Sequence, residues 1–427
     1  MNKLAIITMA ALLASTPLFA NGSQESQTKG ADSAALRMSW WGGDARHTGT
    51  LDAIDAFEKA NPNITVEAEY SGWDGYYQKI VTQLAGETAA DLIQIDQPWL
   101  SELSSKDQVF AEITPDMVDL SQFDANFLKN YCTYDGKLLG LPTGINTETL
   151  FLDKKILSEN NIDPTTWTWD NIVIYGTQMH QANNDKYLIN TDPQSFATLW
   201  FPIYLSQVAG HLVNPDKTIG FTEAQAEQTF TYFKQWFDKG VVEPFSKSSL
   251  YFNKSEENPT WINGNSALYL NWVSTISKSL NSKPANNTAT TTIPVMDNAV
   301  NSGVISRPSQ LFTIYAKTKN KDASLKFLNY LYSNENVIKT LGTCRGIPAT
   351  TSARKILKEN SMLSEIEEHA TNEGIAQAGD AQNQYEMNSN ITQNIQDVCD
   401  EFGYGKLSPR QAAQKLVSLI NETLTTI

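Results

Sequence analysis

Residues 36–96 read LRMSWWGGDARHTGTLDAIDAFEKANPNITVEAEYSGWDGYYQKIVTQLAGETAADLIQID, and this stretch alternates between two hydrophobic periods. A period of two is typical of a strand, and apolar residues three or four apart are typical of a helix. The order is strand, helix, strand, helix, strand, over 36–41, 51–61, 64–70, 76–86 and 91–96. Such an order predicts an α/β fold whose sheet is mostly parallel and flanked by helices on both faces.

Turn and stop signals separate these elements. Gly42-Gly43 follows the first strand, Asn61-Pro62 ends the first helix, and Gly86 ends the second. The middle of the chain is aromatic and mostly helical. Later segments with clear periodicity are a strand over 312–316, a helix over 323–331, and a helix over 409–424 that Ser408 caps.

Length and charge restrict the class of protein. A chain of 427 residues exceeds what one hydrophobic core usually serves, so two domains are expected. The formal charge of −15 repels polyanions and acidic membranes, so nucleic acid is not an expected partner. The chain contains no HExxH, GxSxG, GxxxxGK[ST] or GxGxxG motif, and its four histidines lack metal-ligand spacing. We therefore expect no metal, no cofactor and no catalysis.

The N-terminus has the pattern of an export signal. Lys3 precedes an apolar run over 4–14, and Leu18-Phe19-Ala20 resembles a cleavage site. We expect a signal peptide over 1–20, a flexible leader over 21–35 and a periplasmic protein.

The three cysteines are Cys132, Cys344 and Cys399. An odd number leaves at least one without an intramolecular partner. We expect them to be small buried hydrophobic residues, although one disulfide between two of them stays open.

Ligands of open α/β sheets bind at the carboxyl ends of the strands. That rule gives two groups of candidate binding residues and one further aromatic residue. Those after the first strand are Trp41, Gly43, Asp44, Arg46 and His47; those after the third are Asp96, Gln97 and Trp99; Trp73 opens the helix after the second strand. A tryptophan could instead pack in the core, and the polar residues could instead form solvated turns.

Five short segments occur in the order and spacing of one known family. They are AFEKANPNITV at 56–66, AADLIQ at 89–94, DGKLLGLP at 135–142, GNSALY at 264–269 and GIPA at 346–349. On these segments the chain resembles the family 1 extracellular solute-binding proteins, the maltose-binding-protein-like group. The resemblance implies carbohydrate capture for an ABC importer: a monomer binds a mono- or oligosaccharide by lobe closure and delivers it to a membrane permease.

The resemblance also implies two α/β lobes, each with a mostly parallel sheet, and a ligand cleft between them. Crossing segments are expected near 141–146, 294–303 and 345–348. The lobes are then discontinuous, with 36–143 plus 298–344 in the N-terminal lobe and 144–297 plus 345–427 in the C-terminal lobe.

A sugar has apolar C–H faces that stack on aromatic rings and hydroxyls that planar side chains can bind. Trp272 occupies the family's stacking position, and Asn146 follows the first crossing. Trp200, Phe196 and Tyr385 are further aromatic candidates of the second lobe. Arg307 and Arg345 lie near predicted crossings, where each could reach the ligand or form an ion pair with an acid.

The stretch 39–47 resembles a branch that takes up plant-wall or uronate-type oligosaccharides. Arg46, Arg307 and Arg345 favour an acidic sugar, because guanidinium groups bind carboxylates in pairs of hydrogen bonds. Neutral sugars stay open, since arginine also donates to hydroxyls. A secreted glycoside-active enzyme that uses Asp44 and Asp96 also stays open, as does a binding protein for a non-sugar solute.

Overall fold

The computed structural model describes residues 33–105, 107–163, 167–252, 254–284 and 286–427. The predicted signal peptide lies outside the described residues, as does the predicted leader up to residue 32. The last two residues of that leader, Ala34 and Ala35, belong to the first strand instead.

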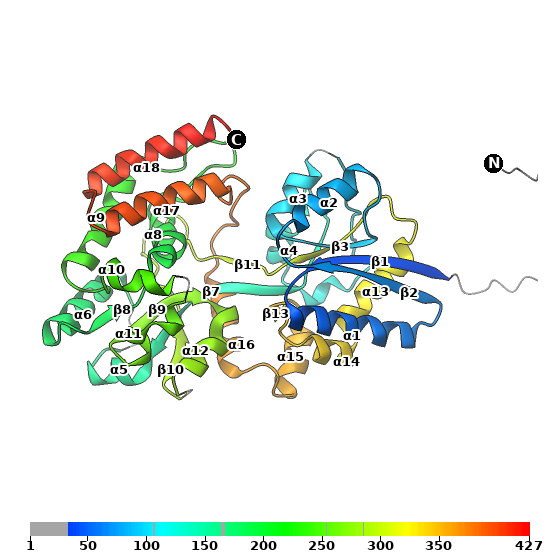
Figure 1. Cartoon of the computed structure of the whole chain (residues 1–427), viewed down its shortest axis with the longest axis horizontal. Helices are drawn as coiled ribbons and strands as arrows, with labels where there is room; N and C mark the ends of the chain where they lie inside the picture. The colour runs from blue at the N-terminus through cyan, green and yellow to red at the C-terminus, as the bar shows by residue number, and fades with distance from the viewer. Residues whose placement is uncertain (1–32, 106, 164–166, 253, 285) are drawn as a thin grey trace, which may run out of the picture. The chain divides into compact units, whose positions relative to one another are not determined.

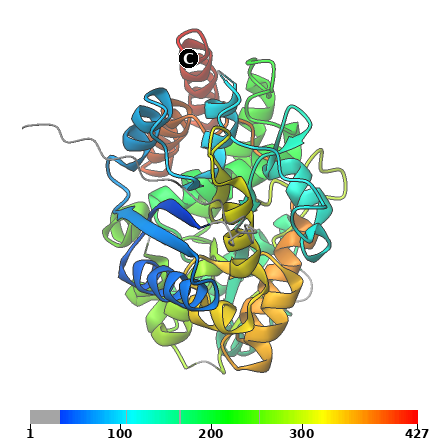
Figure 2. The same ribbon diagram turned by 90° about the vertical axis from the view of Figure 1, so that its right-hand side faces the viewer.

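The first lobe contains a five-stranded sheet in the order β2-β1-β3-β12-β6. The expected parallel pairing holds for β1 with β2 and β3, but β12 is antiparallel to both β3 and β6. Helices α1 and α2 lie on opposite faces of this sheet (Figures 1 and 2). The elements are β1 Ala34–Trp41, α1 Asp44–Ala60, β2 Ile64–Ser71, α2 Tyr76–Ala85, β3 Leu92–Ile95, α3 Gln97–Ser104, β6 Leu141–Pro142, β12 Leu311–Ile314, α13 Lys321–Ser333 and α14 Glu335–Leu341.

The second lobe contains strands in the order β10-β7-β9-β8. Only β8 and β9 are parallel, so the expectation of a mostly parallel sheet is wrong for this lobe. Its largest elements are β7 Gly144–Asp153, α6 Trp169–Ala182, β8 Tyr187–Ile189, α8 Phe201–Ala209, α9 Glu223–Asp238, β9 Ser266–Trp272, β10 Thr288–Thr291, α17 Ser389–Gly403 and α18 Pro409–Leu424. As predicted, Ser408 caps α18, and it does so through a capping box with Gln411.

Shorter elements complete the chain. They are η1 Leu120–Gln122, α4 Ala125–Tyr131, β4 Thr133–Tyr134, β5 Lys137–Leu138, α5 Lys154–Glu159, α7 Pro193–Ser195, η2 Phe196–Trp200, α10 Phe245–Ser248, η3 Ser249–Tyr251, η4 Ser255–Glu257, α11 Pro259–Ile262, η5 Val273–Thr275, α12 Ile276–Ser282, β11 Ser306–Pro308, β13 Ile347–Pro348, α15 Thr351–Glu359 and α16 Glu365–Gln377.

Three segments join the two lobes, and β7 is the longest of them (Figure 1). Strands β11 and β13 both pair antiparallel with the start of β7, so that Arg307 lies opposite Asn146 and Pro348 opposite Gly144. A Cβ atom on Gly144 would lie 2.5 Å from the carbonyl oxygen of Arg345. Glycine at this position therefore allows the segment 345–348 to approach the start of β7.

Two of the expected lobe boundaries, at residues 298 and 345, differ from the packing of the two cores. Val304 packs in the core of the second lobe and Leu311 in that of the first, so the second crossing comes later than residue 298. Helix α15 packs against α13 and α14 of the first lobe, although residues from 345 onward are expected in the second. A small cluster that includes Phe151, Tyr269 and Ile338 joins the two regions.

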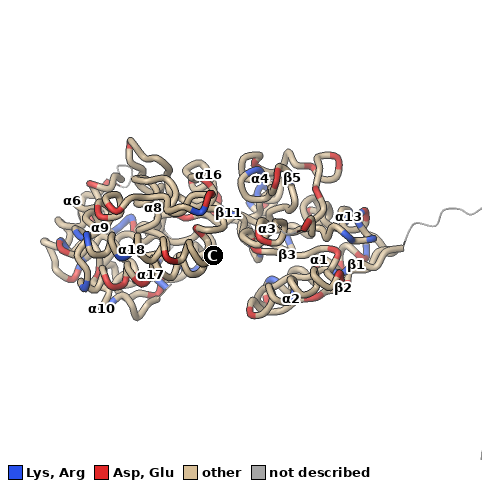
Figure 3. Tube along the Cα trace, turned by 90° about the horizontal axis from the view of Figure 1, so that it is seen from above, with Lys and Arg blue, Asp and Glu red and all other residues tan. Residues whose placement is uncertain are grey.

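Acidic and basic residues are interspersed along both lobes (Figure 3). Of the helices in the described part of the chain, none is both long and apolar enough to cross a lipid bilayer. All three cysteines are free: Cys132 lies in the first core, Cys399 in the second, and Cys344 is half-buried.

Candidate functional site

Aromatic rings from three strand ends meet in the first lobe. Trp41 ends β1, Trp73 follows β2, and Trp99 lies in α3 after β3. The ring centroids of Trp73 and Trp99 are 5.2 Å apart with planes 25° from parallel, and Trp41 lies 5.1 Å and 5.3 Å from them. Tyr76 and Tyr77 of α2 pack against the same rings. We call these five residues the aromatic cluster.

The members of the aromatic cluster differ in exposure. Trp73 is 52% exposed, whereas Trp41 is 8% exposed and forms the base of the cluster. The hydroxyl of Tyr76 donates to the carbonyl oxygen of Gln94 at 2.9 Å, which fixes α2 to β3. The cluster thus offers one half-exposed indole on a rigid aromatic base, a surface suited to the C–H face of a sugar ring.

Polar side chains hold the backbone at the end of β1. The carbonyl oxygen of Trp41 accepts from Nε2 of Gln94 at 3.0 Å and from Nη1 of Arg46 at 3.1 Å. Nε of Arg46 also donates to the carbonyl oxygen of Cys344 at 3.3 Å. Arg46, in the first turn of α1, therefore ties the end of β1 to the segment that precedes β13.

Arg345 lies two residues before β13 and is only 4% exposed. It donates through Nη1 to Oε1 of Gln94 and through Nη2 to Oγ1 of Thr50, the second at 2.6 Å. Burial and the nearby Arg46 lower the pKa of Arg345. Each terminal nitrogen of Arg345 makes one hydrogen bond inside the protein, while its Nε has no partner among the described residues, so direct contact between Arg345 and a ligand stays a prediction.

A second group of side chains lies on the crossing strands. Cζ of Arg307 is 5.3 Å from the centre of the Trp272 ring, and Asn146 lies opposite Arg307 in the strand register. Oδ1 of Asn146 accepts from the backbone nitrogen of Ser274 at 3.1 Å. The stacking and hydroxyl-binding residues that were expected from the second lobe and its crossings are thus close together.

Asp96 extends this group into the first lobe. Its carboxylate caps α3 by accepting from the backbone nitrogen of Gln97 at 3.0 Å. Burial raises the pKa of Asp96, and the charge of Arg307 opposes that rise. The charge of Arg307 on β11 therefore acts on the carboxyl group at the end of β3.

Two of the predicted aromatic contacts lie elsewhere. Trp200 and Phe196 are both fully buried in the second core, where Trp200 packs edge to face on Trp236 with centroids 5.0 Å apart. The prediction that Trp200 contacts a ligand is therefore wrong: the core covers its whole side chain. His47 is held by Trp40, whose Nε1 donates to its Nδ1 at 3.1 Å.

The remaining candidates stay predictions. Gly43 caps α1 and Asp44 occupies its first turn, where a carboxylate interacts favourably with the helix dipole. Both are exposed at the end of β1. Gln97 begins α3 and is half-buried.

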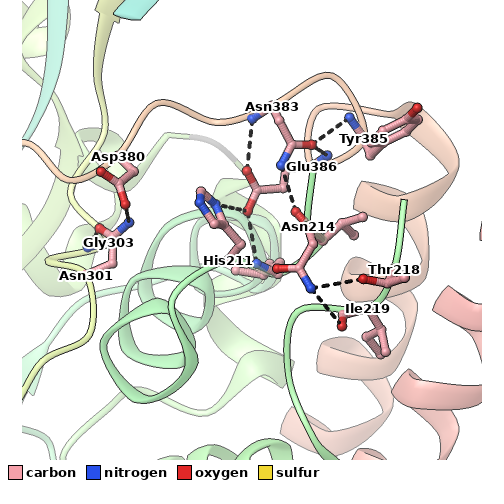
Figure 4. Close-up of polar contacts among 12 residues, drawn as sticks. His211, Asn214, Thr218, Ile219, Asn301, Gly303, Asp380, Asn383, Tyr385 and Glu386 are labelled. Atoms are coloured by element: carbon pink, nitrogen blue, oxygen red, sulfur yellow. Dashed lines mark hydrogen bonds and ion pairs between the residues drawn. The ribbon is translucent and has the colours of Figure 1, made fainter. Parts of the chain in front are cut away.

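A polar cluster fixes the loop between α16 and α17 (Figure 4). Glu386 accepts from the backbone nitrogens of Leu212 and Asn383, each at 2.9 Å, and contacts Nδ1 of His211 at 3.3 Å. Tyr385 lies on this loop, where its backbone nitrogen donates to Oδ1 of Asn383 at 3.0 Å. The cluster holds this loop against the C-terminal end of α8.

Sequence reasoning missed four residues of the region: Tyr76, Tyr77, Gln94 and Glu148. The two tyrosines lie in a segment whose periodicity indicates a helix and carries no sign of binding. Gln94 and Glu148 are polar residues inside runs of buried strand residues, and that burial is known only from the structure.

Comparison with known proteins identifies the family. A family described as bacterial extracellular solute-binding protein matches residues 52–367. Binding proteins of Brucella abortus and Brucella suis are 25% identical over 193 residues, which are 44% of this chain and 46% of each relative. The match therefore spans about half the length of these relatives.

Solved structures match almost the whole chain. A periplasmic solute-binding protein of Pectobacterium atrosepticum is 29% identical, with a TM-score of 0.77 over 92% of this chain and 99% of that one. A periplasmic oligogalacturonide-binding protein of Yersinia enterocolitica is 26% identical over the same shares, with a TM-score of 0.79. A de novo designed cysteine esterase is 26% identical, with a TM-score of 0.84 over 93% and 99%. The two-lobe fold and the family match confirm the resemblance, and this chain belongs to the family of bacterial extracellular solute-binding proteins.

Proposed function

We propose that this protein is exported, captures an oligosaccharide between its lobes, and delivers it to an ABC-type membrane permease. The observation that carries the proposal is the aromatic cluster at the strand ends, with its half-exposed Trp73. Half of a tryptophan ring in solvent contributes little to folding but offers a stacking surface to a pyranose. Trp272 offers a second such surface beside Arg307.

An acidic sugar is the substrate class that the charges favour. In the described part of the chain, Arg37 pairs with Glu69, but Arg46, Arg307 and Arg345 form no salt bridge with any carboxylate. An ion-pairing role for these arginines is therefore weakened. A uronate carboxylate would supply a salt-bridge partner for Arg307, while Arg345 and Arg46 add positive potential near the end of β1. The Yersinia relative was solved with saturated digalacturonic acid, which supports this class.

Capture requires that the ligand bind the closed form better than the open one. Asp96 and the aromatic cluster belong to the first lobe, whereas Trp272 belongs to the second. A sugar that contacts both groups stabilises closure, and a closed pair of lobes is the state that a permease would recognise.

Catalysis is not part of the proposal, in spite of the designed esterase with the same fold. A nucleophilic cysteine needs a lowered pKa. Burial instead raises the pKa of Cys344, the half-buried thiol, and that of the buried Cys399. A glycosidase mechanism is disfavoured because Asp96 is already engaged as a helix cap.

A thermal-shift screen with paired acidic and neutral oligosaccharides tests the proposal. A ligand at a hundredfold excess over its Kd should stabilise the fold by about 2.7 kcal/mol. Oligogalacturonides should raise the melting temperature, and a Trp73→Ala variant should respond less at the same concentration. If no saccharide stabilises the protein while a non-sugar solute such as a polyamine does, the proposed function is wrong.

A further inference from the structure

Glu148 is a buried carboxyl group that the sugar site described above does not use. It lies in the middle of β7 and is 1% exposed. Its Oε2 accepts from the backbone nitrogen of Ile305 at 2.8 Å, and its own backbone nitrogen donates to the carbonyl oxygen of Ile305 at 3.0 Å. Its Oε1 is buried and has no hydrogen-bond partner among the described residues. Glu148 thus clamps the first crossing strand to the segment that leads into β11.

The strand registers place this carboxyl next to the proposed sugar site. Glu148 lies opposite Trp272 in the β7–β9 pair, and Asn146 lies opposite Arg307 in the β7–β11 pair. Side chains two residues apart in a strand point to the same face. Glu148 and Asn146 therefore share the face on which Arg307 approaches the Trp272 ring.

The charged and titratable groups around Glu148 are few. Arg307 of β11 favours its ionised form, and Tyr131 of α4 is close enough that Glu148 raises the pKa of its hydroxyl. Beyond these, Asp380 acts on Tyr131 and Asp96 on Arg307. Burial dominates and raises the pKa of Glu148 to about 8.

We propose that Glu148 is a positioning residue of the sugar site, which anchors the β11 segment and whose protonation determines how much positive charge Arg307 offers to an acidic ligand. With the proton bound, Glu148 is neutral and Arg307 attracts a uronate carboxylate. When the proton leaves to solvent, the new carboxylate competes with the ligand for Arg307. Uptake of acidic sugars is thereby favoured in acidic surroundings. The part that concerns the ligand rests on the proposed function.

The variant Glu148→Gln separates the two roles of the side chain. Its amide oxygen can still accept from Ile305, so the anchor stays, but no proton is exchanged. Glu243→Gln is the matched control: Glu243 is 5% exposed in the second lobe and accepts from Asn258 and Thr260. Calorimetry measures the Kd of digalacturonic acid and of neutral galactobiose at pH 6.5 and pH 9.0.

For the wild type and for Glu243→Gln, the Kd of digalacturonic acid should rise about tenfold between the two pH values, the effect of one pKa unit of coupling. For Glu148→Gln it should change less than twofold, and galactobiose should bind equally at both pH values in every protein. An unchanged pH dependence in Glu148→Gln would overturn the proposal, as would an equal loss of galactobiose binding. If Glu148→Gln does not fold, the wild type and Glu243→Gln still test the proposal, because an equal Kd of digalacturonic acid at the two pH values would overturn it.

Thermal unfolding without ligand keeps this inference separate from the proposed function. As the pH rises from 6.5 to 9.0, the melting temperature of the wild type should fall relative to that of Glu148→Gln, whether or not the protein binds digalacturonic acid. If no acidic sugar binds but the two profiles diverge, the ligand class is wrong and the titration of Glu148 stands. If the melting temperatures of the two proteins change in parallel with pH, Glu148 does not titrate in this pH range and the proposal is wrong.

Discussion

Trp73→Ala is the substitution that tests the aromatic cluster most directly. A tryptophan has roughly 250 Å² of surface, so an exposed fraction of 52% leaves about 130 Å² in solvent. A sugar ring stacked on one face would cover about half of that area. At about 25 cal/mol per Å², the contact contributes roughly 1.6 kcal/mol, or about a 15-fold change in Kd. This value lies within the range of about 1–3 kcal/mol for other ring stacks on aromatic side chains.

The assay is calorimetric titration of digalacturonic acid into the wild type and the variant, with thermal unfolding of both in the absence of ligand. Tyr404→Ala is the matched control, because Tyr404 is 45% exposed and packs edge to face on Phe245 in the second lobe. We expect a weaker affinity for Trp73→Ala alone, with similar small losses of stability in both variants. An affinity within twofold of the wild type for Trp73→Ala would refute the stacking role of the aromatic cluster.

Three further predictions concern Trp272, Arg345 and Glu148. Trp272→Ala should abolish measurable sugar binding and leave the fold intact; unchanged calorimetric affinity would exclude Trp272 from the site, and a collapse of the melting temperature would show a packing role. Arg345→Met should lower the free energy of unfolding in urea by about 2–3 kcal/mol, because Gln94 and Thr50 lose their buried donors; a change below about 0.5 kcal/mol would contradict that role. The raised pKa of Glu148 means that the folded state holds a proton which the unfolded state releases near pH 4.5, so stability should fall by up to about 1.4 kcal/mol per pH unit up to about pH 8 and then level off. The free energy of unfolding of Glu148→Gln in urea should lack this fall with pH. The same pH dependence in the wild type and the variant would contradict the raised pKa of Glu148.

The sequence predicted the local elements well because their signals are local. The alternation in 36–41, the Asn61-Pro62 stop and the Ser408 cap all appear in the structure. Strand orientation in the second lobe was predicted wrongly, because it depends on pairing between β7 and β9, about 120 residues apart, and period-two alternation carries no direction.

The site was predicted in part for a similar reason. Trp41 ends β1 and Trp73 follows β2, so the rule for strand ends names both as candidates. The same rule says nothing of the exposure of Trp200, which lies in a helical segment rich in aromatic residues. Arg345 was expected at a crossing, but α15 packs on the first lobe, and there the guanidinium of Arg345 is bound by Gln94 and Thr50, which are distant in the chain. Glu148 was overlooked because a single acid among 47 has no distinguishing pattern until the strand is known to be buried.

We propose that the site holds an acidic sugar through Arg307, which forms no salt bridge within the described part of the chain, although the carboxyl groups of Asp96 and Glu148 act on it from a distance. The most direct test of this proposal is a paired titration of digalacturonic acid and neutral galactobiose at about 20 mM and about 200 mM salt, at one pH. Partly exposed charge pairs are screened within about 8–10 Å near physiological ionic strength. We predict tighter binding of the digalacturonic acid and a loss of that advantage at high salt. Equal affinity for the two sugars with no dependence on salt would show that the ligand is neutral and that Arg307 serves hydroxyl groups.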